Sequence, residues 1–149
     1  MVQPVNPNRR LIIPALGGLY ASAYEGAETL LRVIAGGFLV IHGFPKIMNP
    51  FGAAGMVESI GFYPPTFWAL MLALGEFGGG LLLMIGLLTR PAAAVTTFIL
   101  LVTVYFHWIL QAQGFSGAEK SLLWAAITLF FVIRGGNRHS VDAKIGREF

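Results

Sequence analysis

The stretch that decides the fold is LALGEFGGGLLLMIGLLTR, residues 72–90, in which one acid, Glu76, stands among apolar residues and glycines. About 20 predominantly apolar residues are enough to cross the hydrocarbon core of a bilayer, which is about 30 Å thick. The stretch therefore predicts a transmembrane helix. A charged side chain at the bilayer centre costs about 2.5–3.5 kcal/mol on the mildest scale, so we expect Glu76 to face other helices.

The composition of the whole chain agrees with a membrane protein. Of its 149 residues, 56% are hydrophobic and 11% are charged, whereas a soluble domain carries about 25% charged residues. The chain has no cysteine, which excludes disulfides and thiolate metal sites. The net charge is +3, and the basic residues lie at the ends of apolar runs, so nucleic acid is not an expected partner.

Four apolar segments are candidates for membrane spans, and they lie near residues 29–44, 67–88, 92–110 and 117–133. They predict an all-α fold, an integral membrane four-helix bundle. We expect this bundle to occupy residues 29–134, between an N-terminal surface segment at 1–28 and a C-terminal tail at 135–149.

The connections between the spans differ in length and composition. Prolines at 45, 50, 64 and 65 follow the first span and break helices, which leaves room for one short interfacial helix near residues 51–60. The second connection, LLTRPA at 87–92, is so short that spans two and three are expected to form an antiparallel hairpin. Pro91 suits the first turn of the third span, where its missing N–H is not needed.

The distribution of Lys and Arg predicts the orientation of the bundle, because cytoplasmic loops carry the excess of basic residues. Only Lys46 and Lys120 fall on one side of the four spans. The other side carries Arg9, Arg10, Arg32, Arg90, Arg134, Arg138, Lys144 and Arg147. Both termini are therefore predicted to be cytoplasmic, in a multi-pass protein of the cell (inner or plasma) membrane.

The N-terminal stretch RRLIIPALGGLYASA, residues 9–23, resembles a signal peptide, with a basic start and a small-residue end at Ala21-Ser22-Ala23. Its apolar part is short and is interrupted by Pro14 and two glycines. We therefore favour a segment on the cytoplasmic surface over a cleaved leader.

Glu76 lies eight residues past Trp68, which places it about 12 Å into the second span at about 1.5 Å per residue. Two interpretations remain open: a buried hydrogen bond that fixes helix packing, or a role in handling protons or a ligand. The neighbouring Gly75, Gly79 and Gly80 predict a close helix contact, since small residues let two helix backbones approach.

Ionisable residues of the other spans are expected at a similar depth. In the first span, His42 and Lys46 are one turn apart near the outer end. His107 lies near the outer end of the third span, and Glu119 opens the fourth span on the same side, with Glu76 somewhat deeper. These residues predict a polar pocket in the outer leaflet, and histidine can exchange protons near neutral pH. The candidate catalytic residues are Glu76, His42 and His107, and the candidate cofactor-binding residues are Lys46, Glu119, Arg32 and Trp108.

Other interpretations of these residues are weaker. His42 and His107 on facing helices could ligate a haem, or a non-haem metal together with carboxylates, but no other feature of the sequence favours either, so no metal site is predicted. Arg32 is expected to pair with Glu28 one turn back. Trp108 belongs to a set of aromatic residues that suits an interfacial belt or the wall of a quinone site: Tyr63, Trp68, Tyr105 and Trp108.

Three blocks of the sequence resemble successive signature blocks of the DoxX family of small four-span membrane proteins. They are LLRVIAGGFLVIHGFPKI at 30–47, GEFGGGLLLMIGLLTRPAA at 75–93 and GAEKSLLWAAITLFFVIRGGNRHSVD at 117–142. The matching positions are Arg32, His42, Gly43, Lys46, Glu76, Gly79, Gly86, Arg90, Glu119, Gly136, Ser140 and Asp142. The tail GGNRHSVD departs from the more usual glycine-proline-glycine form of the family.

The resemblance implies a four-helix bundle associated with respiratory or redox enzymes, such as the small subunits of thiosulfate:quinone oxidoreductase. The leading hypothesis is a membrane subunit of a quinone-linked oxidoreductase. In it, Glu76, His42 and His107 hold a quinone headgroup and exchange its protons, while Lys46 and Glu119 order the mouth. Electrons would come from a redox partner protein or a small reductant, and the protein could also form a homo-oligomer.

The alternative hypothesis is a non-enzymatic membrane anchor or assembly partner of a redox or stress-response complex, whose polar groups serve packing and docking. A lipid or small-molecule carrier is a third hypothesis. It has little support, because the four spans show neither inverted repeats nor an evident broken helix.

Overall fold

The computed structural model describes residues 11–147, and every regular element in this range is helical. Four helices are long and apolar enough to cross a membrane, which confirms the predicted all-α membrane fold. The elements are α1 (Gly17–Met48), α2 (Ala54–Ser59), α3 (Pro65–Ile85), α4 (Thr89–Tyr105), α5 (Gly114–Arg134) and α6 (Val141–Lys144), with a 3₁₀ turn at Pro14–Leu16 and a π-helical segment at Phe106–Leu110.

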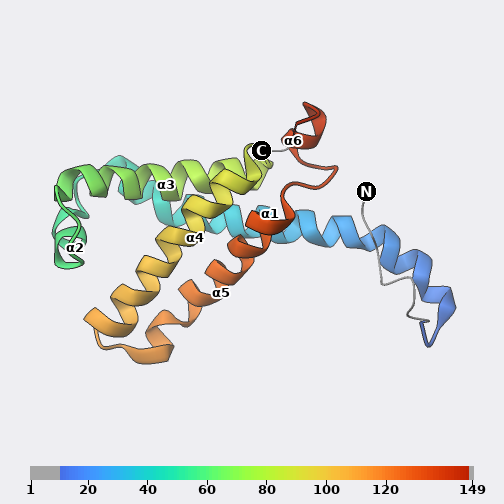
Figure 1. The fold of residues 1–149 in the computed structure, drawn as a ribbon, viewed down its shortest axis with the longest axis horizontal. Coiled ribbons are helices and arrows are strands. Elements are labelled where there is room, and N and C mark those ends of the chain that lie inside the picture. The colour runs from blue at the N-terminus through green and yellow to red at the C-terminus, as the bar shows by residue number, and fades with distance from the viewer. Residues whose placement is uncertain (1–10, 148–149) are drawn as a thin grey trace.

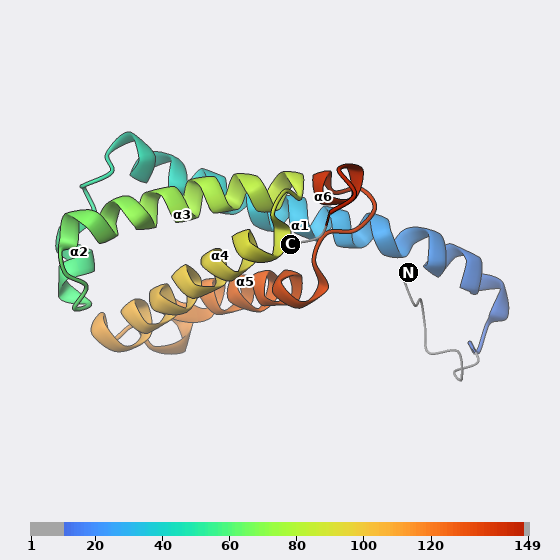
Figure 2. The same ribbon diagram turned by 45° about the horizontal axis from the view of Figure 1, so that its top comes forward.

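The four long helices are arranged as two packed pairs (Figure 1). α1 lies along α3, and α4 lies along α5. α3 and α4 are joined by a tight connection and diverge from it, and α2 lies at the open end of this pair, as both Figure 1 and Figure 2 show. The short helix α2 falls within the 51–60 segment for which an interfacial helix was predicted.

α1 is longer than the span predicted at 29–44. Its 32 residues rise about 48 Å, since each helical residue adds about 1.5 Å, and its N-terminal part extends beyond the other helices (Figure 1). The expected surface segment is therefore continuous with the first span from Gly17 on. Pro45 was expected to break the helix, yet it lies inside the last turn of α1. The predictions for Arg9 and Arg10 fall outside the described residues.

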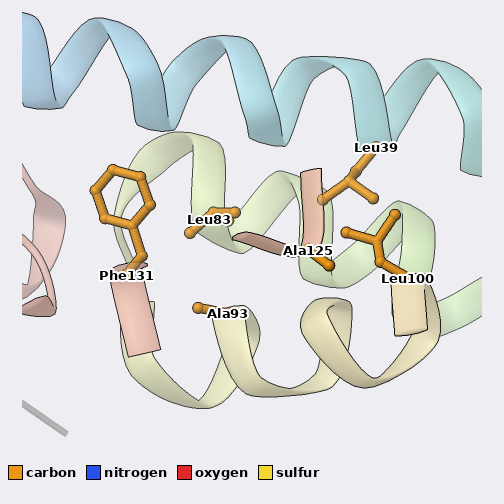
Figure 3. Close-up of a cluster of buried hydrophobic side chains, with 6 residues drawn as sticks. All are labelled: Leu39, Leu83, Ala93, Leu100, Ala125 and Phe131. Atoms are coloured by element: carbon orange, nitrogen blue, oxygen red, sulfur yellow. The ribbon is translucent and has the colours of Figure 1, made fainter. Parts of the chain in front are cut away.

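The helices meet around a small hydrophobic cluster that takes side chains from all four spans (Figure 3). Its members are Leu39, Leu83, Ala93, Leu100, Ala125 and Phe131. Most of the other large apolar side chains of the spans are exposed, as expected for faces that lipid covers. The cluster is small because lipid, rather than a large shared core, surrounds this bundle.

Glycines let α1 and α3 approach at backbone distance. A Cβ added to Gly43 would lie 2.5 Å from the backbone nitrogen of Phe77, and one added to Gly36 would lie 2.6 Å from the carbonyl oxygen of Gly80. Gly80 was predicted to serve a close helix contact, and this contact is with α1. Gly75 and Gly79 face α4 instead, where an added Cβ would meet Ile99 and Thr96 side chains.

The connection between α3 and α4 is held by residues from distant parts of the chain. Gly86 ends α3 in the left-handed conformation, with φ of 74°. Arg32 of α1 donates hydrogen bonds from Nη1 to the carbonyl oxygens of Leu83 and Met84, at 3.0 and 3.1 Å. An arginine at the C-terminal end of a helix also complements the helix dipole, so Arg32 serves as the cap of α3.

Asp142 caps the N-terminal end of α4. Its carboxylate accepts hydrogen bonds from the backbone nitrogens of Leu88 and Thr89, at 2.8 and 2.9 Å, and from the Thr89 hydroxyl at 2.6 Å. The backbone nitrogen of Asp142 donates in turn to the carbonyl oxygen of Gly86, at 2.9 Å. We call Arg32, Gly86, Thr89 and Asp142 the terminal clasp, since they lie at the end of the bundle that carries the C-terminal segment.

Candidate functional site

Glu76 and Lys46 form an ion pair across the contact between α3 and α1. The Lys46 ammonium lies 2.5 Å from Oε2 of Glu76, with side-chain exposures of 30% and 10%. Gly43 lies one turn before Lys46, and its missing side chain lets the two backbones approach beside Glu76. The carboxylate expected to face the bundle therefore does so, and its partner is a lysine from the first span.

The ion pair lines a cavity of about 950 Å³. His42 lines it one turn before Lys46, and the remaining lining is mostly apolar. Trp124 of α5 also lines it, and its ring lies edge-on to His42 with a centroid distance of 5.2 Å. The same indole stacks on Phe38 at 5.4 Å. The cavity thus combines one charged pair with flat aromatic and apolar walls.

His107 lines the same cavity, at the end of α4 away from the clasp. The π-helical segment Phe106–Leu110 carries it, and such wider turns recur at functional sites. Nδ1 of His107 lies 3.0 Å from Oε1 of Gln113. A neutral ring that donates from Nδ1 to this oxygen keeps Nε2 as an acceptor. All three candidate catalytic residues therefore line the same cavity.

The candidate cofactor-binding residues are distributed over several places. Lys46 borders the cavity, whereas Glu119 and Trp108 do not belong to its described lining, and both are exposed. Trp108 packs edge-on against Phe115. Arg32 is only 1% exposed and lies in the terminal clasp, at the opposite end of the bundle.

The prediction that Arg32 pairs with Glu28 is wrong. Glu28 accepts hydrogen bonds from Arg134 of α5, at 2.8 and 3.2 Å, while Arg32 donates to the end of α3. The physical reason is that the carbonyl groups of the last turn of α3 have no partners within their own helix, and Arg32 satisfies two of them. Both arginines thus join spans that are separate in the sequence.

Sequence reasoning did not select Trp124 or give a site role to Lys120, and both line the cavity. Trp124 lies ten residues into α5, about 15 Å from its start at about 1.5 Å per residue. A tryptophan this far from the end of a span does not fit an interfacial belt. That position was the available signal for a wall of the site.

The charged and polar groups of the cavity are suited to hydrogen bonding and proton exchange rather than to metal binding. Within residues 11–147, no three His, Cys, Asp or Glu residues gather closely enough to hold a metal ion. Lys46 supplies up to three N–H donors. One points to Glu76 and one to the carbonyl oxygen of His42, at 3.3 Å, which leaves a third for a ligand.

Comparisons with known proteins agree with the resemblance seen in the three sequence blocks. The DoxX family profile matches residues 27–108. The chain is 28% identical to the inner membrane protein YqjF of Escherichia coli over 120 residues, which cover 79% of this chain and 91% of YqjF. It is 30% identical to a Bacillus subtilis protein named "Putative oxidoreductase CatD" over 123 residues, 80% of this chain and 87% of CatD.

No solved structure gives a significant match. The four apolar helices, the family match and the relative in the inner membrane together make the protein a multi-pass protein of the inner membrane. The family match covers more than half of the chain, and it includes the first span, the glycine-rich second span and the ion pair between them. The chain belongs to the DoxX family.

Proposed function

We propose that this protein is the membrane subunit of a quinone-linked oxidoreductase, and that the cavity beside Lys46 and Glu76 binds the quinone headgroup. The observation that carries the proposal is the ion pair itself. It stands in a largely apolar cavity within the spans, where a charge is costly and is typical of a functional site. One relative of this chain also bears a name that assigns it to the oxidoreductases.

The chemistry of the lining fits both redox forms of a quinone. The carbonyl oxygens of the oxidised ring only accept hydrogen bonds, and the free N–H of Lys46 can donate to one of them. The hydroxyl groups of the reduced ring donate, and the Glu76 carboxylate can accept. Apolar and aromatic groups, among them Trp124, provide surfaces for the flat ring.

Reduction of a quinone takes up two electrons and two protons. In this proposal the electrons come from a reduced partner protein or a small reductant, and the protons pass through Glu76, His42 and His107. His107 stands in the outer part of the cavity, beside Gln113, where it can exchange protons with water. The chain contributes the site and the proton path.

The experiment is to purify the protein from membranes and to measure the bound quinone by solvent extraction and mass spectrometry. We expect the wild type to retain quinone and Glu76→Gln to lose it, because the amide removes the charge that holds Lys46 in place. Glu58→Gln is the matched control, since Glu58 is an exposed carboxylate of α2; it should retain as much quinone as the wild type.

Equal quinone in the wild type and in Glu76→Gln would contradict the proposal, and so would a wild type that binds none when quinone is added. A membrane anchor without a site gives a different result: Glu76→Gln then lowers stability, while no variant binds quinone.

A further inference from the structure

The cavity extends beyond the part beside Lys46 and Glu76 that is proposed to hold the quinone headgroup. It continues onto the outside of the bundle. Part of its lining is exposed on the outside of α3 and α4. Leu74, Val95 and Phe98 line it while 47%, 49% and 55% of each residue is exposed. In a bilayer these faces meet lipid, so the cavity opens sideways into the hydrocarbon core.

This outer part forms a groove between α3 and α4, which diverge from their tight connection (Figure 2). On α3, the lining runs from Trp68 to Leu82, which is about 21 Å along the helix at about 1.5 Å per residue. The cavity, with Glu76 near the middle of this stretch, therefore extends over about two thirds of the thickness of the hydrocarbon core. The groove is apolar, and it ends near the α3–α4 connection, where Leu88 and Pro91 also line the cavity.

Gly78 leaves free space in the groove about 15 Å along α3 from Trp68, at about 1.5 Å per residue. A Cβ added to Gly78 would meet no atom within 4 Å, although Gly78 lines the cavity. This differs from Gly75 and Gly79, where an added Cβ would come within 3 Å of α4 side chains. Gly78 therefore does not pack against a neighbouring helix, and the absence of a side chain leaves free space in the groove.

Part of the aqueous end of the cavity is covered by α2. Three residues at α2, Met56, Val57 and Ile60, line the cavity together with Phe62. All of them are apolar, and α2 lies at the open end of the α3–α4 pair (Figure 1). A water-soluble ligand would meet an apolar cover there, whereas a lipid-soluble ligand can enter through the groove.

We propose that the α3–α4 groove binds the isoprenoid tail of a membrane quinone whose ring lies beside Lys46 and Glu76, and that the quinone enters from the bilayer. This inference rests on the proposed function. Beyond Glu76, the lining continues six residues along α3 to Leu82, about 9 Å at about 1.5 Å per residue. The headgroup site alone has no need of this apolar continuation, whereas a long tail removes apolar surface from its surroundings along it. The acyl chain of a phospholipid has similar chemistry, and the test separates the two.

The test compares two probes on the purified full chain in nanodiscs: a quinone with a single isoprene unit, and a quinone with the same ring and a full-length tail. Gly78→Phe fills the groove without touching the ion pair, and Val95→Trp fills it from α4 as a second variant. Gly26→Phe is the matched control, because an added Cβ at Gly26 also meets nothing within 4 Å and Gly26 lies in α1, outside the described lining.

In both groove variants we expect the affinity for the full-length quinone to fall about tenfold, while the affinity for the short quinone stays within about twofold of the wild type. Gly26→Phe should change neither affinity. An unchanged affinity for the full-length quinone in a groove variant that binds the short quinone normally would overturn the inference and leave the headgroup site intact.

If the proposed function itself is wrong, the result is different, because the wild type then binds neither quinone. A groove occupied by a phospholipid also overturns the inference. In that case, mass spectrometry of the purified protein shows a phospholipid that Gly78→Phe displaces, while both quinones bind the variant as they bind the wild type.

Discussion

The ion pair between Lys46 and Glu76 is a partly buried charged pair within the spans, where unpaired charges are costly. A buried pair is strongly destabilised when one partner is removed, by about 3–5 kcal/mol, whereas an exposed pair contributes about 0–1 kcal/mol. With exposures of 30% and 10%, this pair stands between the two cases. Each residue therefore stabilises the bundle chiefly through the other.

A double-mutant cycle tests this dependence. We expect Lys46→Met to lower the free energy of unfolding by about 1–3 kcal/mol, because it leaves the Glu76 carboxylate without its cation. Glu76→Gln should lower it by a similar amount. The double variant should lose clearly less than the sum, as contacting residues are not additive. The measurement is reversible unfolding in detergent, followed by circular dichroism; strictly additive losses would show that the two groups do not interact.

The helix ends at the terminal clasp depend on partners from other elements. α3 ends with a glycine, and its last carbonyl groups are met by Arg32 of α1. α4 starts after Leu88, whose φ is 50°, and the backbone nitrogens there are met by the Asp142 carboxylate. The tight turn that sets the divergence of α3 and α4 is thus fixed by α1 and by the C-terminal segment.

Asp142→Asn removes one acceptor from the start of α4. We expect a loss of about 1–3 kcal/mol of stability, because the side-chain amide places a donor where the Thr89 nitrogen also donates. The midpoint of thermal unfolding in detergent measures this loss, and Glu58→Gln, an exposed carboxylate on α2, should leave it unchanged. An unchanged midpoint in Asp142→Asn would mean that the C-terminal segment does not hold the turn.

The spans and their order could be predicted from the sequence, because length, apolarity and helix breakers are local signals. The tight α3–α4 connection and the short α2 were predicted for the same reason. Two features of α1 could not be predicted: its N-terminal extension back to Gly17, and its continuation through Pro45. Pro45 lies in the last turn of α1, which ends three residues later at Met48, so the helix stops soon after the proline rather than before it.

The depth of the candidate site residues along the spans could be predicted from the sequence. Their positions around the bundle axis could not. Helix spacing predicted a similar depth for five groups, and four of them line the cavity while Glu119 does not: Glu76, His42, Lys46, His107 and Glu119. Which lysine meets Glu76 depends on how closely α1 and α3 approach, and that distance is set by Gly43 against the Phe77 backbone. Glu119 is exposed because the rotation of α5 turns its neighbours, rather than Glu119 itself, toward the cavity.

The molecule as a whole places the cavity with the Lys46–Glu76 ion pair toward one end and the terminal clasp at the other, with a lipid-facing groove between α3 and α4. In the proposed function, this arrangement lets a quinone reach the ion pair from the membrane without passing through water. The predicted cytoplasmic position of both termini would put the ion pair in the outer leaflet, since Lys46 and Lys120 lie at the end away from the clasp.

The most direct test of the account is photo-crosslinking with a quinone that carries a photoreactive group on its ring, followed by peptide mapping. We predict labels in residues 39–46 and 72–79 and at Trp124, all suppressed by excess unlabelled quinone. Labelling confined to the lipid-facing side chains of α5, such as Leu123, Leu129 and Ile133, would contradict a quinone site beside Lys46 and Glu76.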